Sequence, residues 1–301
     1  LINENKNSMI CFANQNSIPK KMKLFMEGKM HVAQAADEFV RQMLLPRDLN
    51  KKPVREFYQR IYEEVLSNKK VRFYSGKWKI KTLEQFNEFI LGKFINIPRL
   101  EGSVAAECIN LQRDRGSWAK GKNFTLENLI LYKKWYKTQP HNRPHTWIMW
   151  EHDIGLIDEY IDRLEFNPES GYEINRDQLV DLLMDENGNN LIIFQGDDER
   201  SLQRLSKEII SERRGIYRRR ANSGVMEPLT LFVFDEAHKF ISSKRSGKLD
   251  LDSREAVEDI VMRGRKYGLG ALISTQRMGQ LDSNIISQLH TYFVSKLPRR
   301  D

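Results

Sequence analysis

The stretch that decides the fold class lies at 229–241 and reads LTLFVFDEAHKFI. Five apolar residues within Leu229–Phe234 lead directly into Asp235 and Glu236, and His238 follows. A short apolar run of this kind predicts a buried strand, with the two acids at its carboxyl end. By itself the pattern has two interpretations: a catalytic acid pair, or polar residues that end a strand and cap a loop.

The sequence around this stretch alternates between short apolar runs and helical patterns from about Asn175 onward. The apolar runs are NLIIF (Asn190–Phe194), LTLFVF, GALIST and TYFVSKL, and helices are expected through Leu202–Ile210, through Val257–Val261 and near Ile285–Leu289. Such alternation predicts an α/β fold in which a parallel sheet is covered on both faces. Ligands of these folds bind at the carboxyl ends of the strands, where Asp235, Glu236, Ser274, Thr275 and Gln276 fall.

The first part of the chain, 1–170, is predicted to be mainly helical, as an insertion or a companion domain beside an α/β segment at 171–301. Pro53 begins an apolar helical face, Thr82 with Gln85 forms a possible capping box, and Thr125 can cap another helix. Between the first two helices, the aromatic alternation of VRFYSGKWKIK around Ser75-Gly76 predicts a short hairpin.

An apolar strand that ends in Asp-Glu supplies what a nucleotide hydrolase needs. Asp235 would bind Mg²⁺ through a water molecule, because magnesium retains much of its hydration. Glu236 would orient and deprotonate the attacking water, since phosphoryl transfer depends on positioning and charge stabilisation. Gln276, at the tip of the neighbouring strand, would hydrogen-bond that water or the γ-phosphate of ATP.

The block from Leu229 to Leu297 resembles the HerA branch of the HerA/FtsK superfamily of RecA-like hexameric motors. The matching motifs are the DEAH strand end, GRKYGLG, STQR and LDSNIISQLHTYFV, in the order that the family uses, and NLIIF…SLQRLSKEIISERR before them is also similar. The resemblance implies a RecA-like parallel sheet with Walker B and sensor strands at 171–301. A DEAH-box helicase is disfavoured, because GRK precedes STQR here.

The phosphate-binding sequence GxxxxGK[ST], which such a site also needs, does not occur in the chain. The segments YSGKW and RSGKLD lack its spacing and its Ser/Thr. The resemblance places the Walker A loop before the DEAH strand, so we expect it ahead of Leu1 in a longer polypeptide. A non-hydrolysing relative is the alternative.

The resemblance implies an ATP hydrolase that acts as a homo-hexameric ring on double-stranded DNA with ATP and Mg²⁺. It also implies a nuclease or other effector partner, in DNA end processing or antiphage defence. Arg263 and Arg265 are the leading candidates to reach the ATP of a neighbouring subunit, with Lys244 and Arg254 as weaker ones. Alternatively, some of these arginines pair with Glu255, Glu258 or Asp259 on one helix face. His238 and Lys244 are further candidates near the γ-phosphate.

Basic residues provide candidates for contact with nucleic acid. The formal charge is +8 and the isoelectric point is near 9.3, which suits a polyanionic partner. Arg218, Arg219 and Arg220 end the cationic run ERRGIYRRR, which would contact DNA phosphates or be a solvated helix end. Arg277 follows the sensor strand, where a loop facing the pore of the ring is expected.

Other patterns carry weaker expectations. Trp135, Trp147 and Trp150 are interleaved with lysines, which suits single-strand stacking, a core edge or a protein interface, and the interface is favoured. The spacing of His141, His145 and His152 matches no strong metal template. Cys11 and Cys108 stand in apolar settings that predict small buried residues in a reducing compartment, and hence a cytoplasmic location. No apolar run is long enough to span a membrane.

Two other functions fit the same residues. A conjugation or secretion ATPase of this superfamily would move protein or single-stranded DNA at a membrane. A scaffold would keep the ring and lose hydrolysis, which the missing phosphate loop favours.

Overall fold

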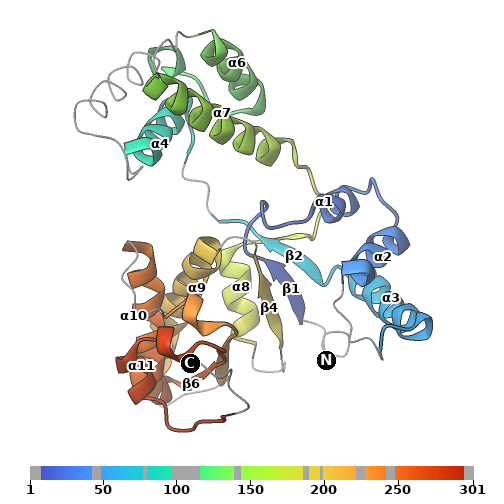
Figure 1. The fold of residues 1–301 in the computed structure, drawn as a ribbon, viewed down its shortest axis with the longest axis vertical. Helices are drawn as coiled ribbons and strands as arrows, with labels where there is room; N and C mark the ends of the chain where they lie inside the picture. The colour runs from blue at the N-terminus through green and yellow to red at the C-terminus, as the bar shows by residue number, and fades with distance from the viewer. Residues whose placement is uncertain are drawn as a thin grey trace. The chain divides into compact units, whose positions relative to one another are not determined.

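The computed structural model describes residues 8–42, 49–76, 80–95, 116–138, 144–185, 190–196, 199–221, 228–241 and 248–294. The chain forms two compact units. Unit 1 combines Leu1–Gly76 with Glu169–Asp301, and unit 2 is Lys77–Pro168. Unit 2 therefore enters the sequence of unit 1 as one insertion (Figure 1).

The larger sheet of unit 1 has four parallel strands in the order β3-β2-β1-β4. The strands are β1 (Met9–Phe12), β2 (Val71–Tyr74), β3 (Glu173–Ile174) and β4 (Ile192–Gln195), and Figure 1 shows β2, β1 and β4 side by side. Ile10 pairs with Val71 on one side and with Ile193 on the other. The inner strand β1 is almost fully buried, which suits its sequence MICF.

The helices of unit 1 are α1 (Lys20–Met26), α2 (Val32–Gln42), α3 (Lys52–Ser67), α8 (Arg176–Leu183), α9 (Glu199–Ala221), α10 (Lys248–Arg263) and α11 (Ser283–Ser287). Short 3₁₀ helices are η2 (Ala237–Lys239), η3 (Gly264–Tyr267) and η4 (Met278–Gln280). Local sequence fixes several of these ends. Pro53 lies in the first turn of α3, and Asn175 and Gln178 form a complete capping box at α8. No helix in the described ranges is both long and apolar enough to cross a membrane.

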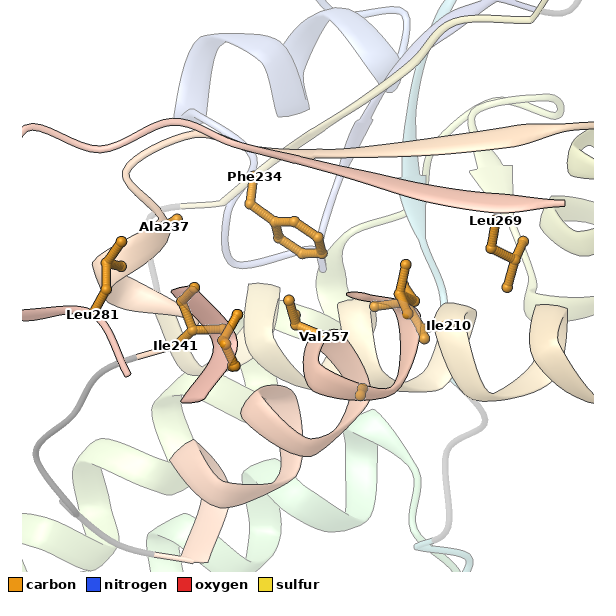
Figure 2. Close-up of a cluster of buried hydrophobic side chains, with 10 residues drawn as sticks. Ile210, Phe234, Ala237, Ile241, Val257, Leu269 and Leu281 are labelled. Carbon is orange, nitrogen blue, oxygen red and sulfur yellow. The ribbon is translucent and has the colours of Figure 1, made fainter. Parts of the chain in front are cut away.

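A second sheet of unit 1 pairs β5 (Thr230–Phe234) with β6 (Leu269–Ile273) in parallel. Phe234 of β5 and Leu269 of β6 are buried against the helices, together with Ile210, Val257 and Leu281. Figure 2 shows Phe234 pointing from its strand toward Ile210 and Val257. The predicted strands and their flanking helices are therefore confirmed here, and the fold is α/β with parallel strands, compatible with a RecA-like core.

The opposite face of the β5–β6 pair is apolar and open in the described part of the chain. Leu231 and Val233 are 62% and 60% exposed, and Leu272, the register partner of Val233, is 47% exposed. Leu231 lies over Gly270, its own partner, at 3.3 Å from the position that a Cβ would take. We predicted cover on both faces, whereas the described helices cover one. We name Leu231, Val233 and Leu272 the open face.

The region before 170 differs from the predicted arrangement. Two of its segments, β1 and β2, are strands of the main parallel sheet, and only 77–168 forms a separate unit. The hairpin predicted at 71–81 is wrong, because β2 pairs in parallel with β1 and β3. The buried β1 offers an apolar partner for the aromatic alternation, which a two-stranded hairpin would leave half exposed. The strand predicted at TYFVSKL is also absent from 291–294, where Phe293 is 90% exposed.

Unit 2 packs α4 (Leu83–Ile95), η1 (Ser117–Ala119), α6 (Leu126–Lys137) and α7 (Pro144–Glu165) around an aromatic core. Thr125 caps α6 by accepting from the backbone N–H of Asn128, as predicted. Two buried tyrosines satisfy their hydroxyls within the core: Tyr132 donates to Asn87 and Tyr136 donates to Asp153. Its core is thus independent of the parallel sheets.

Cys11 lies in β1 and is fully buried. Burial raises the pKa of its thiol to about 12, so the thiolate that reacts or binds metal does not form near neutral pH. The prediction of a small buried residue is confirmed for Cys11, and Cys108 lies outside the described residues.

Gly264, in GRKYGLG, lies where α10 meets β6. A Cβ at this position would stand 2.6 Å from the backbone oxygen of Leu269, which the strand holds in place. We expect Gly264→Ala to lower the free energy of unfolding by about 1–3 kcal/mol. Gly279→Ala, where a Cβ meets nothing within 4 Å, is the matched control and should change stability by less than about 0.5 kcal/mol. Equal denaturation midpoints for the two variants would contradict this packing.

Candidate functional site

The site is built by the register of β5 and β6. Phe234 pairs with Ile273, so both strands end at the same level and release their next residues at one edge. Backbone bonds continue across this edge: Ser274 N–H donates to Phe234 O at 2.9 Å, and Ala237 N–H donates to Ser274 O at 2.9 Å. The turn that carries Asp235 and Glu236 is therefore joined to the one that carries Thr275 and Gln276.

The two acids differ in their surroundings. Asp235 is exposed, so its carboxylate is open to solvent or to a ligand. Glu236 is half-buried and has a left-handed backbone, with φ 49° and ψ 48°. A non-glycine residue in this region costs roughly 1 kcal/mol and is found where the surrounding structure fixes the chain. The conformation turns one carboxylate oxygen of Glu236 inward, while the side chain keeps 39% exposure.

The inward oxygen of Glu236 lies close to the ring of His238. Its Oε2 is buried and receives no hydrogen bond from the described residues, but His238 Nδ1 lies 3.3 Å away. The same Nδ1 lies 3.3 Å from Thr275 Oγ1. His238 thus contacts the acid and the sensor strand end at once, and its own side chain is only 13% exposed.

The remaining sensor residues face outward. Gln276 is exposed, as are Arg277 and the following residues of η4. Arg277 N–H donates to Thr275 Oγ1 at 3.1 Å, which closes the turn after β6. Asp235, Glu236 and Gln276, the three residues predicted to carry the chemistry, therefore lie on adjoining turns. Thr275, which was noted only for its place at the strand end, contacts both His238 and the Arg277 N–H.

The arginine candidates differ in how exposed their side chains are and in their ion-pair partners. Arg263 ends α10 with its side chain 64% exposed and 3.8 Å from Asp259, the helix-face pairing that was the alternative interpretation. Arg265 is exposed on η3. Arg254 instead donates to Asp282 at 2.9 Å with both side chains largely buried, so it is held within its own chain. Arg254 is therefore a poor candidate for reaching a neighbouring subunit.

Some predicted residues cannot be placed. Lys244 lies outside the described residues, and Arg218, Arg219 and Arg220 belong to the last turns of α9, where their side chains are not described. His141 lies outside the described residues, as does the side chain of His145, and His152 contacts Asp153 in unit 2 at 3.3 Å. Among the described residues no group of three or more His, Cys, Asp and Glu could hold a metal ion.

Two tryptophans of the predicted interface have core contacts. Trp135 stacks on Trp118 with ring centroids 5.5 Å apart, and Trp150 packs against the same aromatic cluster. Trp147 has no described side chain. Packing in unit 2 accounts for Trp135 and Trp150 without a partner protein.

The sequence does contain one GxxxxGK spacing, GSWAKGKN at 116–123, with Asn123 in place of Ser or Thr. The structure gives it another role. Lys122 donates back to Trp118 O and lies over the Trp118 ring. The segment contains the short helix η1 and does not join a strand to a helix. A phosphate loop needs that strand-to-helix context, so this segment is no substitute for the missing motif.

The site suits the ligands that its chemistry implies. An exposed carboxylate at a strand end is an oxygen donor of the kind that Mg²⁺ prefers, with room for the water molecules that the ion retains. The orphaned inward oxygen of Glu236 is a hydrogen-bond acceptor that still lacks a donor. Asp235 would hold the metal, and Glu236 would accept a proton from a bound water.

Comparison with known proteins gives one partial likeness. The chain is 35% identical over 88 residues to the DNA double-strand break repair helicase HerA of Saccharolobus solfataricus (strain ATCC 35092 / DSM 1617 / JCM 11322 / P2). The matched segment covers 29% of this chain and 17% of the length of that helicase. No protein-family model matches the chain. The likeness suggests a relationship to the HerA/FtsK superfamily.

Proposed function

We propose that this chain belongs to an ATP-dependent DNA translocase or helicase of HerA type that works as a homo-hexameric ring on double-stranded DNA. The observation that carries the proposal is the level pairing of β5 and β6, which joins the Glu236 turn to the Thr275–Gln276 turn. The partial likeness to an archaeal HerA supports it. A nuclease or another effector enzyme is the proposed partner, in DNA end processing or antiphage defence.

In this proposal each side chain has a separate task. Asp235 holds Mg²⁺ through water, and the ion neutralises charge on the triphosphate when it is bound. Glu236 orients the attacking water and takes its proton. Gln276 hydrogen-bonds that water or the γ-phosphate from the neighbouring turn. His238 contacts the inward oxygen of Glu236. Lys244 remains a candidate for the γ-phosphate side.

The phosphate-binding loop is proposed to come from sequence outside these 301 residues. Two observations support this source: GxxxxGK[ST] does not occur in the chain, and the open face is apolar across paired strands. A helix that follows a phosphate loop could cover that face, because parallel sheets are normally buried on both sides.

Arg263 and Arg265 are proposed to act on the ATP of the next subunit, and Arg277, with Arg218–Arg220, on DNA phosphates. Exposure of Arg263, Arg265 and Arg277 supports both assignments.

Replacing Arg263 and Arg265 together with alanine should lower turnover in the assembled ring and leave nucleotide binding intact. Unchanged turnover would remove the proposed trans role.

The proposal is tested with the intact protein. We expect ATP hydrolysis that needs Mg²⁺, stops when the metal is chelated, and rises when linear duplex DNA is added. Stimulation by single strands alone, with firm association of the protein to membranes, would favour a conjugation or secretion ATPase instead. ATP binding without turnover in a protein that carries the phosphate loop would favour the scaffold.

A further inference from the structure

Four residues form a continuous chain of contacts from the acid to an exposed loop. Glu236 Oε2 is 3.3 Å from His238 Nδ1, His238 Nδ1 is 3.3 Å from Thr275 Oγ1, and Thr275 Oγ1 accepts from Arg277 N–H at 3.1 Å. We name this chain the Glu236–Arg277 relay. Its outer end is main chain, so the relay depends on where the loop lies and not on the Arg277 side chain.

The inner end of the relay lies against the inward oxygen of the Glu236 carboxylate. A carboxylate can only accept hydrogen bonds, and the buried inward oxygen of Glu236 lies 3.3 Å from Nδ1 of the His238 ring. Thr275 contacts the ring at the same nitrogen, because its hydroxyl oxygen lies 3.3 Å from Nδ1. The left-handed backbone of Glu236 restricts the side chain further. In this arrangement one of the two catalytic oxygens is turned away from solvent.

The outer end of the relay is exposed. Gln276, Arg277 and the residues of η4 are all exposed, whereas the loop is fixed at its far end by Asp282. The Asp282 N–H donates to Ile241 O at 3.0 Å and its carboxylate pairs with Arg254. A ligand that moves this loop therefore displaces Arg277 N–H relative to Thr275, while the anchor at Asp282 stays in place.

We propose that Thr275 and His238 are positioning residues that hold Glu236 in a resting orientation and release it when a ligand displaces the 276–280 loop. The loop would be displaced by a polyanion, which its exposed Arg277 fits. The inference rests on the proposed function, because it assigns Glu236 the role of activating water. It adds a physical link by which DNA on the loop would raise ATP turnover.

Thr275→Val tests the relay in the intact protein, because valine keeps the shape of threonine and removes the hydroxyl. We expect turnover without DNA to rise about tenfold, within the range usual for coupling between two sites, and turnover with DNA to stay near its original ceiling. The ratio of stimulated to basal turnover therefore falls toward one. Thr275→Ser, which restores the hydroxyl, should restore the ratio.

The outcomes separate the relay from the proposed function. An unchanged ratio in Thr275→Val overturns the relay, and so does an equal fall in basal and stimulated turnover, which indicates a structural role only. Glu236→Gln is measured beside it. If that variant loses hydrolysis while the Thr275→Val ratio stays unchanged, the proposed function stands and the relay fails. If Glu236→Gln hydrolyses ATP normally, the proposed function itself fails.

Discussion

Glu236→Gln is expected to lower ATP turnover by a factor on the order of 10²–10⁴, the usual contribution of a general base. Glutamine has the size of glutamate and the same backbone preferences, so the left-handed turn after β5 should form as before. The amide cannot take a proton from water, whereas Asp235 and the rest of the phosphate contacts are unchanged. ATP affinity should therefore remain close to that of the unaltered protein.

The measurement has two arms with the intact protein. Phosphate release at saturating ATP, with duplex DNA present, reports turnover, and titration calorimetry with ATP and Mg²⁺ reports binding. Glu255→Gln is the matched control, because Glu255 is exposed on α10 and the substitution removes the same charge. Turnover within twofold of normal in Glu236→Gln would remove Glu236 as the general base. Loss of binding would show that the residue holds the nucleotide instead.

Phe234→Ala is expected to lower the free energy of unfolding by about 3–5 kcal/mol, because it removes a large side chain from a packed interior. Phe234 is 6% exposed and touches the Phe240 ring, with centroids 5.5 Å apart, inside the cluster that joins β5 and β6 to α9 and α10. Its neighbour Val233 is 60% exposed on the other side of the same strand. Val233→Ala should cost about 1 kcal/mol or less.

The stabilities of Phe234→Ala and Val233→Ala must be compared with a probe that reports the unfolding of unit 1. All five tryptophans lie between 77 and 168, so their fluorescence reports on unit 2 alone. Urea unfolding followed by far-ultraviolet circular dichroism covers both units, and subtracting the tryptophan transition isolates the effect on the sheets. Similar losses in the two variants of residues 1–301 would mean that the open face is covered. In the intact protein, a larger loss of stability in Val233→Ala would show that another segment covers the open face.

The sequence predicted β5, the strand that ends in the two acids, and missed β1 and β2 of the four-stranded sheet. β4, β5 and β6 were predictable because each is an apolar run bounded by polar residues. β1 escaped notice because its four residues, MICF, are too few to show a period. β2 was assigned to a hairpin because its pairing partner β1 lies 61 residues earlier in the chain (71 − 10 = 61). Only tertiary contacts decide such a choice.

The site was predictable at the level of residue types and not of geometry. Placement at strand ends followed from parallel pairing, so Asp235, Glu236 and Gln276 were found in the expected region. Neither periodicity nor motif specifies that Glu236 has a positive φ or that His238 lies between Glu236 and Thr275. Likewise, the apolar run LFVF at the end of β5 indicated burial on both faces, whereas Phe234 is 6% exposed and Val233 is 60% exposed.

Unit 2 occupies the crossover between two neighbouring parallel strands, since Gly76 follows β2 and Glu169 precedes β3. Such a crossover usually holds a single helix, and here a complete module with its own core takes that place. A module attached at one joint in the sequence can be exchanged, lengthened or lost while the strands that bear Asp235 and Glu236 keep their sequence. Diversity among related chains should therefore concentrate in this cassette, leaving the chemistry of the strand ends constant.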